Sequence, residues 1–124
     1  MPILTVCKKF TFEAAHFLPN HLGACKNIHG HGFKLEVEVK MSETSHRDMV
    51  IDFSDLKRIV NENIIDKVDH SFLNDVFPDI APTAENLLRR FADLLKGKFF
   101  DHNCWLVRMR LHETENSFAE WRSE

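Results

Sequence analysis

Two stretches of the chain alternate between apolar and polar residues, as strands with one buried face do. At positions 33 to 41, Phe, Leu, Val, Val and Met alternate with Lys and Glu. Positions 105 to 113 alternate in the same way, and their apolar members are Trp105, Val107, Met109 and Leu111. These patterns predict two antiparallel strands, with Trp105 and Val107 on the core side of the second.

Two further strands are expected from weaker patterns. Residues 3–12 are rich in strand-forming residues, but the apolar positions change sides between Val6 and Phe10. An extra residue in the strand would produce this change, so we expect a bulge within Cys7 to Lys9. Residues 117–122 follow a turn at Glu115-Asn116 and are expected to form a short closing strand.

Between the second and third strands, apolar residues recur at helical spacing in two segments. The first has Ser54 as its expected N-cap and an apolar stripe at positions 56, 59, 60 and 64. The second begins at Thr83, carries its stripe to Leu95, and has Gly97 at the expected C-terminal cap. The order ββααββ predicts an α+β fold in which two helices cover one face of a four-stranded antiparallel sheet.

Length and composition narrow the class of protein. A chain of 124 residues without repeats or linkers is expected to form a single domain over residues 1–124. The net charge is −3 with acids and bases interspersed, so nucleic acid is not an expected partner. No apolar run approaches the ~20 residues that span a bilayer, and the N-terminus does not resemble a secretion signal. We therefore expect a cytoplasmic protein without membrane contact, whose open sheet edges favour oligomerisation.

Histidines provide the first candidate for chemistry. His29 and His31 flank Gly30, and in extended backbone this spacing directs both imidazoles to the same side. His16 follows the first strand, which would pair with the second as a hairpin and bring the three together. Three histidines form an open zinc site, with the fourth position left for water or substrate. An isolated His-x-His pair is also compatible with a polar surface.

The three cysteines, an odd number, are expected to be reduced thiols. Cys25 precedes His29 by four residues and has two possible roles. It is either the fourth ligand of a closed structural zinc site, or a base or nucleophile beside the metal, where the nearby charge favours the thiolate. The spacing does not separate these roles. Cys7 and Cys104 lie on expected strands and are interpreted as small buried residues.

Three more residues offer acid–base or binding chemistry. Asp69 and His70 are adjacent after the first helix, and a carboxylate beside an imidazole can orient it and raise its basicity. Glu113 continues the apolar side of the last long strand, where a carboxylate lies either in solvent or against a ligand. A surface charge pair and a solvated strand end are the alternatives for these residues.

Seven short motifs occur in an order that resembles one enzyme family. They are Phe10-Thr11-Phe12-Glu13-Ala14-Ala15-His16, Cys25-Lys26-Asn27-Ile28-His29-Gly30-His31, Val50-Ile51-Asp52-Phe53, Leu56-Lys57, Val68-Asp69-His70-Ser71-Phe72-Leu73-Asn74, Pro82-Thr83-Ala84-Glu85-Asn86 and His112-Glu113-Thr114. The chain resembles the 6-pyruvoyltetrahydropterin synthase family, most closely its bacterial and archaeal branch of 6-carboxytetrahydropterin synthases. Ala84 departs from this resemblance, because relatives often have Ser or Thr there.

The resemblance implies a T-fold, in which the sheets of three ββααββ subunits form a barrel and two trimers stack as a homo-hexamer with active sites between subunits. It also implies a role for each candidate residue. Zn²⁺ is bound by His16, His29 and His31; Cys25 is the catalytic thiol; Asp69 and His70 form an acid–base pair; and Glu113 anchors the pterin, helped by Thr83 and Glu85.

The implied activity is that of a zinc-dependent lyase. It converts 7,8-dihydroneopterin triphosphate and water to 6-carboxy-5,6,7,8-tetrahydropterin, acetaldehyde and triphosphate, a step toward queuosine and other deazapurines. One alternative is a pyruvoyl-type synthase that stops after triphosphate elimination. A related enzyme that cleaves dihydroneopterin usually has glutamate in place of the cysteine, so Cys25 argues against it. A non-catalytic zinc- or pterin-binding module is the alternative from another class.

Overall fold

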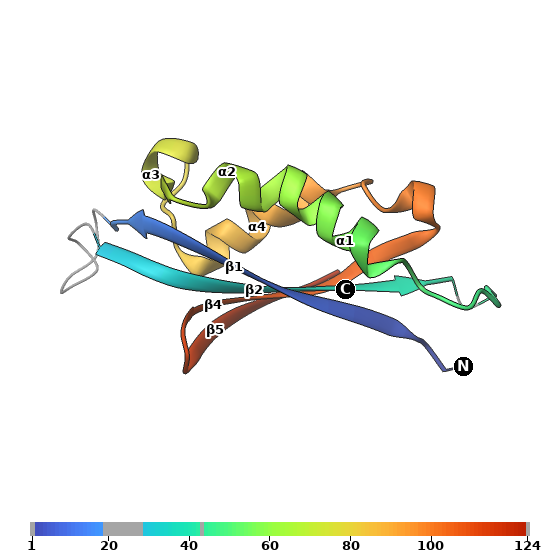
Figure 1. Ribbon diagram of the computed structural model, residues 1–124. Helices are drawn as coiled ribbons and strands as arrows, with labels where there is room; N and C mark the ends of the chain where they lie inside the picture. The colour runs from blue at the N-terminus through green and yellow to red at the C-terminus, as the bar shows by residue number, and fades with distance from the viewer. Residues whose placement is uncertain (1, 19–28, 43, 124) are drawn as a thin grey trace.

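In the computed structural model, helices cover one face of a twisted sheet (Figure 1). The model describes residues 2–18, 29–42 and 44–123, and of residue 29 the backbone only. The elements, in chain order, are β1 (Thr5–His16), β2 (His29–Met41), α1 (Phe53–Val60), a π-helical segment (Asn61–Ile65), α2 (Asp66–Val68), β3 (Ser71–Phe72), α3 (Leu73–Val76), α4 (Ala84–Leu95), a 3₁₀ turn (Phe100–His102), β4 (Cys104–Thr114) and β5 (Ser117–Arg122).

The strand order in the sheet is β3-β1-β2-β4-β5. The four long strands are antiparallel neighbours, and two helical segments separate β2 from β4, so the expected ββααββ order is confirmed. The sequence patterns did not predict β3. It contributes two residues, Ser71 and Phe72, which pair in parallel with Ala14 and Ala15 at the outer edge of β1.

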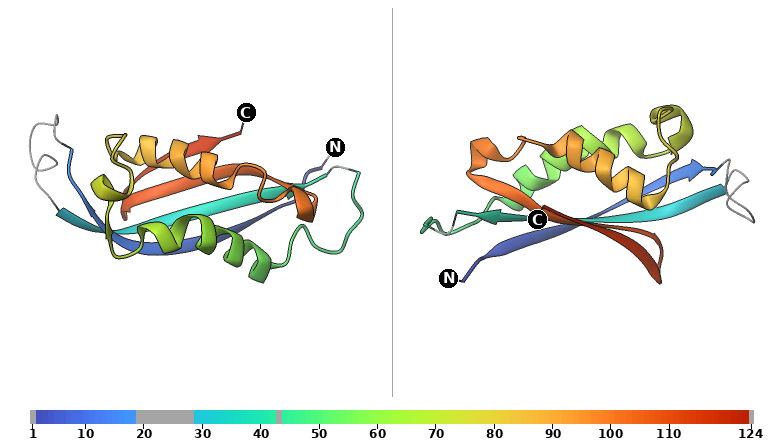
Figure 2. Two further views of the ribbon diagram at one scale, coloured as in Figure 1. Left: turned by 90° about the horizontal axis from the view of Figure 1, so that it is seen from above. Right: turned by 180° about the vertical axis from the view of Figure 1, so that it is seen from behind.

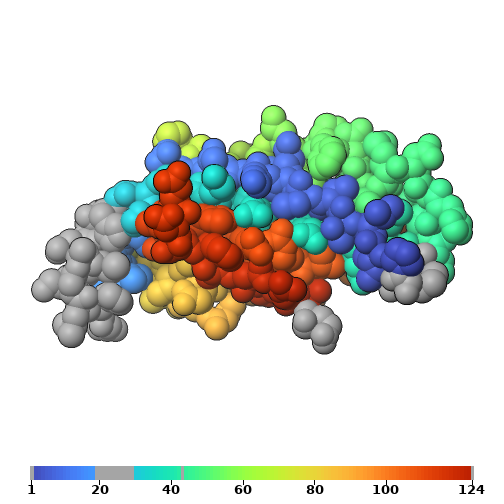
Figure 3. Space-filling view, turned by 90° about the horizontal axis from the view of Figure 1, so that it is seen from below, coloured from blue at the N-terminus to red at the C-terminus, as the bar shows by residue number. Residues whose placement is uncertain are grey.

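The core lies between the sheet and the helices, and α1 and α4 run side by side over it (Figure 2). Phe12 of β1 stacks on Phe33 of β2 with ring centroids 4.9 Å apart, and Phe91 of α4 contacts Phe12 edge-on. All three rings are buried, and burial of each stabilises the fold by roughly 1.5–3 kcal/mol. None of the described helices covers the opposite face of the sheet, where residues of the strands form much of the surface (Figure 1, Figure 3).

The prediction of a bulge within Cys7 to Lys9 is wrong. The β1–β2 register is unbroken from Thr5↔Lys40 to His16↔His29. Val6, Lys8 and Phe10 therefore lie on the same side of β1, and the polar Lys8 interrupts the apolar side without an extra residue in the strand. A register shift occurs instead between β2 and β4, where Glu38 pairs with Arg108 but Val39 pairs with Leu106.

Because of this shift, the first residues of β4 face the side of the sheet opposite to the one that alternation along β4 predicts. Cys104 is buried and Leu106 packs against the core, whereas Trp105 is 39% exposed. The expectation that Trp105 and Val107 lie on the core side with Met109 is therefore wrong. A bulge inserts one extra residue, here Val107, and so changes the alternation of every residue before it.

The helix ends are set by local hydrogen bonds. Asp52, rather than the expected Ser54, is the N-cap of α1, and its Oδ1 accepts from the Ser54 amide at 2.8 Å. Thr83 caps α4 as expected, its Oγ1 accepting from the Asn86 amide at 3.1 Å. Gly97 follows the C-cap residue Lys96 with φ of 76°, the backbone conformation expected of a glycine just past the end of a helix. In the described part of the chain, no helix combines the length and apolar character needed to span a membrane.

Candidate functional site

The register of β1 and β2 brings the histidine positions together at one end of the hairpin. Backbone position 16 pairs directly with position 29, and His31 pairs with Ala14 one step further into the sheet. The expected approach of His16 to the His29-Gly30-His31 segment is therefore confirmed for the backbone. The rings of His16 and His31 meet edge to face, with centroids 5.0 Å apart, against the buried ring of Phe33.

His16 is held by a hydrogen bond that fixes its tautomer. The side chain is 1% exposed, and its Nδ1 lies 2.9 Å from the carbonyl oxygen of Pro82. A carbonyl only accepts, so Nδ1 carries the proton and donates it. In the neutral ring the lone pair is then on Nε2, which lies 3.9 Å from Oε1 of Glu113. A hydrogen bond of this kind on the other ring nitrogen is typical of metal-binding histidines.

Glu113 completes a group of three donors. One ligand atom each from His16, His31 and Glu113 lies within 4.8 Å of the others. Between β4 and β5 the pairing moves from His112↔Phe118 to Thr114↔Ser117, which leaves Glu113 as the extra residue of a second bulge. Bulges re-aim a side chain, and this one places the carboxylate, 30% exposed, beside the buried His16.

A small pocket of about 190 Å³ adjoins Glu113. Its lining residues are Ala84, Glu85, Glu113, Ser117, Phe118 and Ala119. The structure therefore brings Glu85 to the same pocket as Glu113, as the binding role expected of both would require. Thr83 does not line this pocket, and its Oγ1 accepts the Asn86 amide hydrogen that begins α4.

Asp69 and His70 lie on the other side of β1, at its outer edge. Oδ1 of Asp69 accepts from the Glu13 amide at 2.9 Å, and the His70 amide donates to the Glu13 carbonyl at 2.6 Å. The second carboxylate oxygen of Asp69 is 3.6 Å from Nε2 of His70, which fits the expected pair. The His70 side chain is 80% exposed, and neither residue belongs to the donor group around His16. Cys25 lies outside the described residues.

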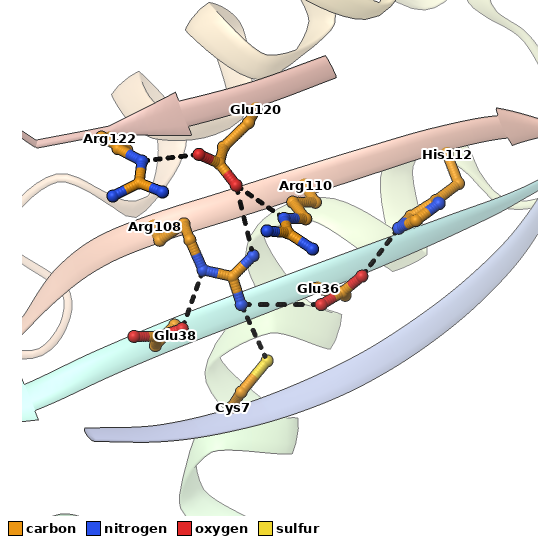
Figure 4. Close-up of polar contacts among 8 residues, drawn as sticks. All are labelled: Cys7, Glu36, Glu38, Arg108, Arg110, His112, Glu120 and Arg122. Atoms are coloured by element: carbon orange, nitrogen blue, oxygen red, sulfur yellow. Dashed lines mark hydrogen bonds and ion pairs between the residues drawn. The ribbon is translucent and has the colours of Figure 1, made fainter. Parts of the chain in front are cut away.

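The helix-free face has a second polar cluster that the sequence patterns did not indicate (Figure 4). Arg108 lies at its centre, 2.8 Å from a carboxylate oxygen of Glu38 and 3.6 Å from oxygens of Glu36 and Glu120. Burial raises the pKa of Glu36, but a hydrogen bond from His112 and the charge of Arg108 outweigh it and lower that pKa overall. Hydrogen bonds from Arg110 and Arg122 lower the pKa of Glu120 to about 2.

The thiols in the described part of the chain are poor nucleophiles. Burial raises the pKa of Cys7 more than the guanidinium of Arg108 lowers it, although the two side chains are 3.8 Å apart. Burial likewise raises the pKa of Cys104, which is 0% exposed. Both remain protonated thiols at neutral pH, and reactivity requires the thiolate. Cys104 is therefore the small buried residue that was expected, whereas Cys7 is only partly covered and is exposed to solvent, so the expectation that it is buried is wrong.

A larger apolar pocket of about 520 Å³ lies at the opposite end of β4 and β5. Residues of α4, the 3₁₀ turn and the two strands line it, including Phe99, Phe100, Trp105 and Trp121. None of the expected site residues borders it. This pocket is larger than the one beside Glu113, but it lacks the convergent donors that the His16 region provides.

Comparisons with known proteins cover nearly the whole chain. A family model described as 6-pyruvoyl tetrahydropterin synthase matches residues 5–124. The chain is 34% identical over 140 residues to a Haemophilus influenzae protein named 6-carboxy-5,6,7,8-tetrahydropterin synthase, covering 94% of this chain and 97% of that one. It is 35% identical over 105 residues to Dictyostelium discoideum 6-pyruvoyl tetrahydrobiopterin synthase, covering 82% and 76%.

The structural comparison agrees over the full length. Caenorhabditis elegans 6-pyruvoyl tetrahydropterin synthase superposes on the chain with a TM-score of 0.85 at 25% identity, and covers 100% of this chain and 98% of that one. A protein of Wolinella succinogenes without an assigned function superposes with a TM-score of 0.81 at 19% identity, covering 100% of both chains. The expected T-fold is confirmed.

Proposed function

The chain belongs to the 6-pyruvoyl tetrahydropterin synthase family, and we propose that it is a zinc-dependent lyase of the 6-carboxytetrahydropterin type. Its substrates are 7,8-dihydroneopterin triphosphate and water, and its products are 6-carboxy-5,6,7,8-tetrahydropterin, acetaldehyde and triphosphate. The observation that carries the proposal is the convergence of His16, His31 and Glu113, from three strands, at one end of the sheet. The name of the Haemophilus influenzae relative supports the choice of product.

The two histidines of this group, His16 and His31, fit a zinc ion. Two ligand atoms about 2.1 Å from the same zinc are at most about 4.2 Å apart, so donors within 4.8 Å need only a small side-chain adjustment. The lone pair of His16 Nε2 is directed to this place by the bond from Nδ1 to Pro82. We propose His16, His29 and His31 as the ligands. A bound zinc ion would supply Lewis-acid polarisation of hydroxyl groups of the substrate.

Glu113 is proposed to anchor the pterin rather than to complete the metal site. Its carboxylate lies between His16 and the pocket that Glu85 also lines. The amino-pyrimidinone edge of a pterin presents neighbouring N–H donors, and a carboxylate accepts two of them as a bidentate pair. Thr83 and Glu85 are proposed to assist, and Ala84 offers no side-chain hydrogen bond at this wall.

The proton transfers are assigned to Cys25, Asp69 and His70 from the family resemblance. Cys25 as a thiolate would remove a carbon-bound proton from the substrate side chain. His70 would move a second proton, with its ring oriented by the Asp69 carboxylate 3.6 Å away. Loss of triphosphate follows from this redistribution, and delivery of a proton to the departing two-carbon fragment accompanies carbon–carbon cleavage.

A homo-hexamer is proposed because the exposed features of one chain are those that subunit contacts would bury. In the described residues β5 is hydrogen-bonded on one side only, and open edges of this kind favour pairing with another chain. Large apolar side chains are exposed in the single chain, among them Leu4, Phe53 and Phe100. The exposed His70 at the β1 edge would then meet a neighbouring subunit, which agrees with active sites between subunits.

The second candidate is a 6-pyruvoyltetrahydropterin synthase, favoured by the names of the Dictyostelium discoideum and Caenorhabditis elegans relatives. Both reactions use the same metal site and the same first proton transfers, so the product separates them. We propose the carboxy product, made in the cytoplasm for queuosine synthesis. A non-catalytic zinc- or pterin-binding module would retain the site without turnover.

The test is product analysis with the purified, zinc-loaded protein and dihydroneopterin triphosphate. Triphosphate and acetaldehyde are measured together, the latter by trapping as a hydrazone, and the pterin is identified by mass. Equal amounts of both with 6-carboxytetrahydropterin would support the proposal. Triphosphate without acetaldehyde would assign the pyruvoyl reaction, and pterin binding without either product would assign the non-catalytic module.

A further inference from the structure

The end of β1 is joined along its outer edge to the segment that contains Asp69 and Asn74. Three alternate residues, Glu13, Ala15 and Phe17, are bonded to this segment, each through a different kind of contact. Glu13 is held by Asp69 and the His70 amide, Ala15 pairs with the two-residue strand β3, and Phe17 is bonded to Asn74. These contacts of Glu13, Ala15 and Phe17, here called the outer seam, run along β1 on the side away from β2 and end immediately after His16.

Asn74 bonds to Phe17 at both of its backbone groups. The Phe17 amide donates to Oδ1 of Asn74 at 3.0 Å, and Nδ2 of Asn74 donates to the Phe17 carbonyl at 3.0 Å. The side-chain amide thus presents the donor and acceptor that a neighbouring strand would present. The rings of Phe17 and Phe72 stack in the same seam, with centroids 5.9 Å apart and planes at 14°.

The position of this contact relative to His16 gives it a consequence for the site. The Phe17 amide nitrogen belongs to the peptide plane that leaves His16, so Asn74 fixes the backbone on the C-terminal side of that histidine. The last rung of the ladder, His16↔His29, fixes it from β2. Among the described residues, none after His16 is paired with β2. On the outer edge, where the pairing with β3 ends at Ala15↔Phe72, Asn74 supplies the two bonds that a longer β3 would make with Phe17.

We propose that Asn74 is a positioning residue that sets the direction of the His16 ring and hence the affinity of the metal site. The inference rests on the proposed zinc binding. Two contacts then define the ring: Asn74 fixes the backbone that carries it, and Pro82 fixes its Nδ1 at 2.9 Å. Groups hydrogen-bonded to a metal-ligating side chain typically change metal affinity about 10- to 100-fold when they are removed. We expect an effect of this order from Asn74, which holds the adjoining backbone.

The test compares three variants of the full chain. Asn74→Ala removes both bonds to Phe17, and Asn74→Asp keeps the acceptor but places an oxygen against the Phe17 carbonyl. The matched control is Asn63→Ala, since Asn63 is also half-buried and its amide donates to the Ile59 carbonyl at 2.7 Å within its own helical segment. Urea unfolding of the zinc-free proteins compares the stability cost of the three changes.

Zinc affinity is measured by competition with a chromogenic chelator, and Co²⁺ substitution reports the ligand geometry through its visible absorption. Both Asn74 variants are expected to bind zinc about 10- to 100-fold more weakly and to alter the cobalt spectrum. Asn63→Ala should bind as the wild type does. Hydrogen exchange of the Phe17 amide should accelerate in Asn74→Ala, which removes its acceptor, and not in Asn63→Ala.

Wild-type affinity and an unchanged cobalt spectrum in Asn74→Ala would overturn the inference and leave Asn74 a purely structural residue, whatever the loss of stability. Equal weakening in Asn63→Ala would overturn it as well, because the effect would then follow general destabilisation. Absence of zinc and cobalt binding in the wild type would reject the metal site itself. The two failures are therefore distinct.

Discussion

Nδ1 of His16 lies 2.9 Å from the carbonyl oxygen of Pro82, a residue that immediately precedes the N-cap of α4. The bond joins the candidate metal group to the wall of the candidate substrate pocket, because Ala84 and Glu85 at the start of α4 line that pocket. A displacement of α4 would therefore move the His16 ring. This bond therefore links the candidate metal group to the candidate substrate pocket.

The histidine assignment predicts a selective loss of metal. His29→Ala and His31→Ala should each bind almost no zinc when measured by atomic absorption after dialysis, since two histidines remain of the three that an open site requires. His112→Ala is the control, because His112 is bonded to Glu36 on the helix-free face at 2.7 Å. Full zinc retention in His29→Ala would contradict the assignment.

Cys25 is predicted to act in proton transfer and not in metal binding. Cys25→Ala should retain one zinc per chain and the wild-type circular dichroism spectrum but lose turnover by at least about 100-fold, in line with the usual effect of a positioned general base. Cys7→Ala should remain active, since the pKa of that thiol is raised by burial. Loss of zinc in Cys25→Ala would instead identify a closed structural site.

Glu113 is predicted to bind the pterin. Glu113→Gln removes the charge but preserves the shape, and hydrogen bonds to a charged group contribute about 1.5–3 kcal/mol. We expect KM to rise about 10- to 100-fold with the zinc content unchanged. Glu85→Gln, in the same pocket, should have a smaller effect because only Glu113 approaches His16. If Glu113→Gln lost zinc, the carboxylate would be a metal ligand.

Asp69 is predicted to have separable structural and catalytic roles. Asp69→Ala removes the acceptor for the Glu13 amide and should lower the free energy of unfolding by about 1 kcal/mol. Asp69→Asn can keep that acceptor through its amide oxygen but loses the charge beside His70. Both variants should lose turnover, whereas urea unfolding should show a clear stability loss only for Ala. Wild-type turnover in Asp69→Asn would exclude the charge from the mechanism.

The ion pairs of Glu120 predict a specific dependence of stability on pH. Its pKa in the fold is about 2, lowered from an ordinary value of 4.5 by hydrogen bonds from Arg110 and Arg122. A lowered carboxyl pKa stabilises the fold fully above the ordinary value, and this contribution is lost as the pH falls from 4.5 toward 2. Urea midpoints of zinc-free Glu120→Gln should therefore fall less over this range than those of the wild type.

Glu115→Gln, which makes the same charge change in the exposed turn between β4 and β5, should follow the wild-type pH profile. An identical slope for Glu120→Gln and the wild type would show that the cluster around Arg108 does not contribute to acid stability.

The sequence by itself determined the features that depend on residues close together in the chain. Alternation and helical spacing identified the four long strands and the two main helical segments, and Thr83 and Gly97 were recognised as caps because capping depends on neighbouring backbone groups. The His-x-His spacing and the order of the motifs identified the family and the histidine positions.

Only the tertiary structure decided the contacts that depend on a partner distant in sequence. The bulges at Val107 and Glu113 follow from how β4 pairs with β2 and β5, so the sides of Trp105 and Glu113 could not be obtained from alternation within β4 alone. The same is true of the hydrogen bonds from Asn74 to Phe17 and from His16 to Pro82. A backbone carbonyl or a single amide side chain leaves no periodic signal in a sequence, and such groups acquire their roles only where folding places them.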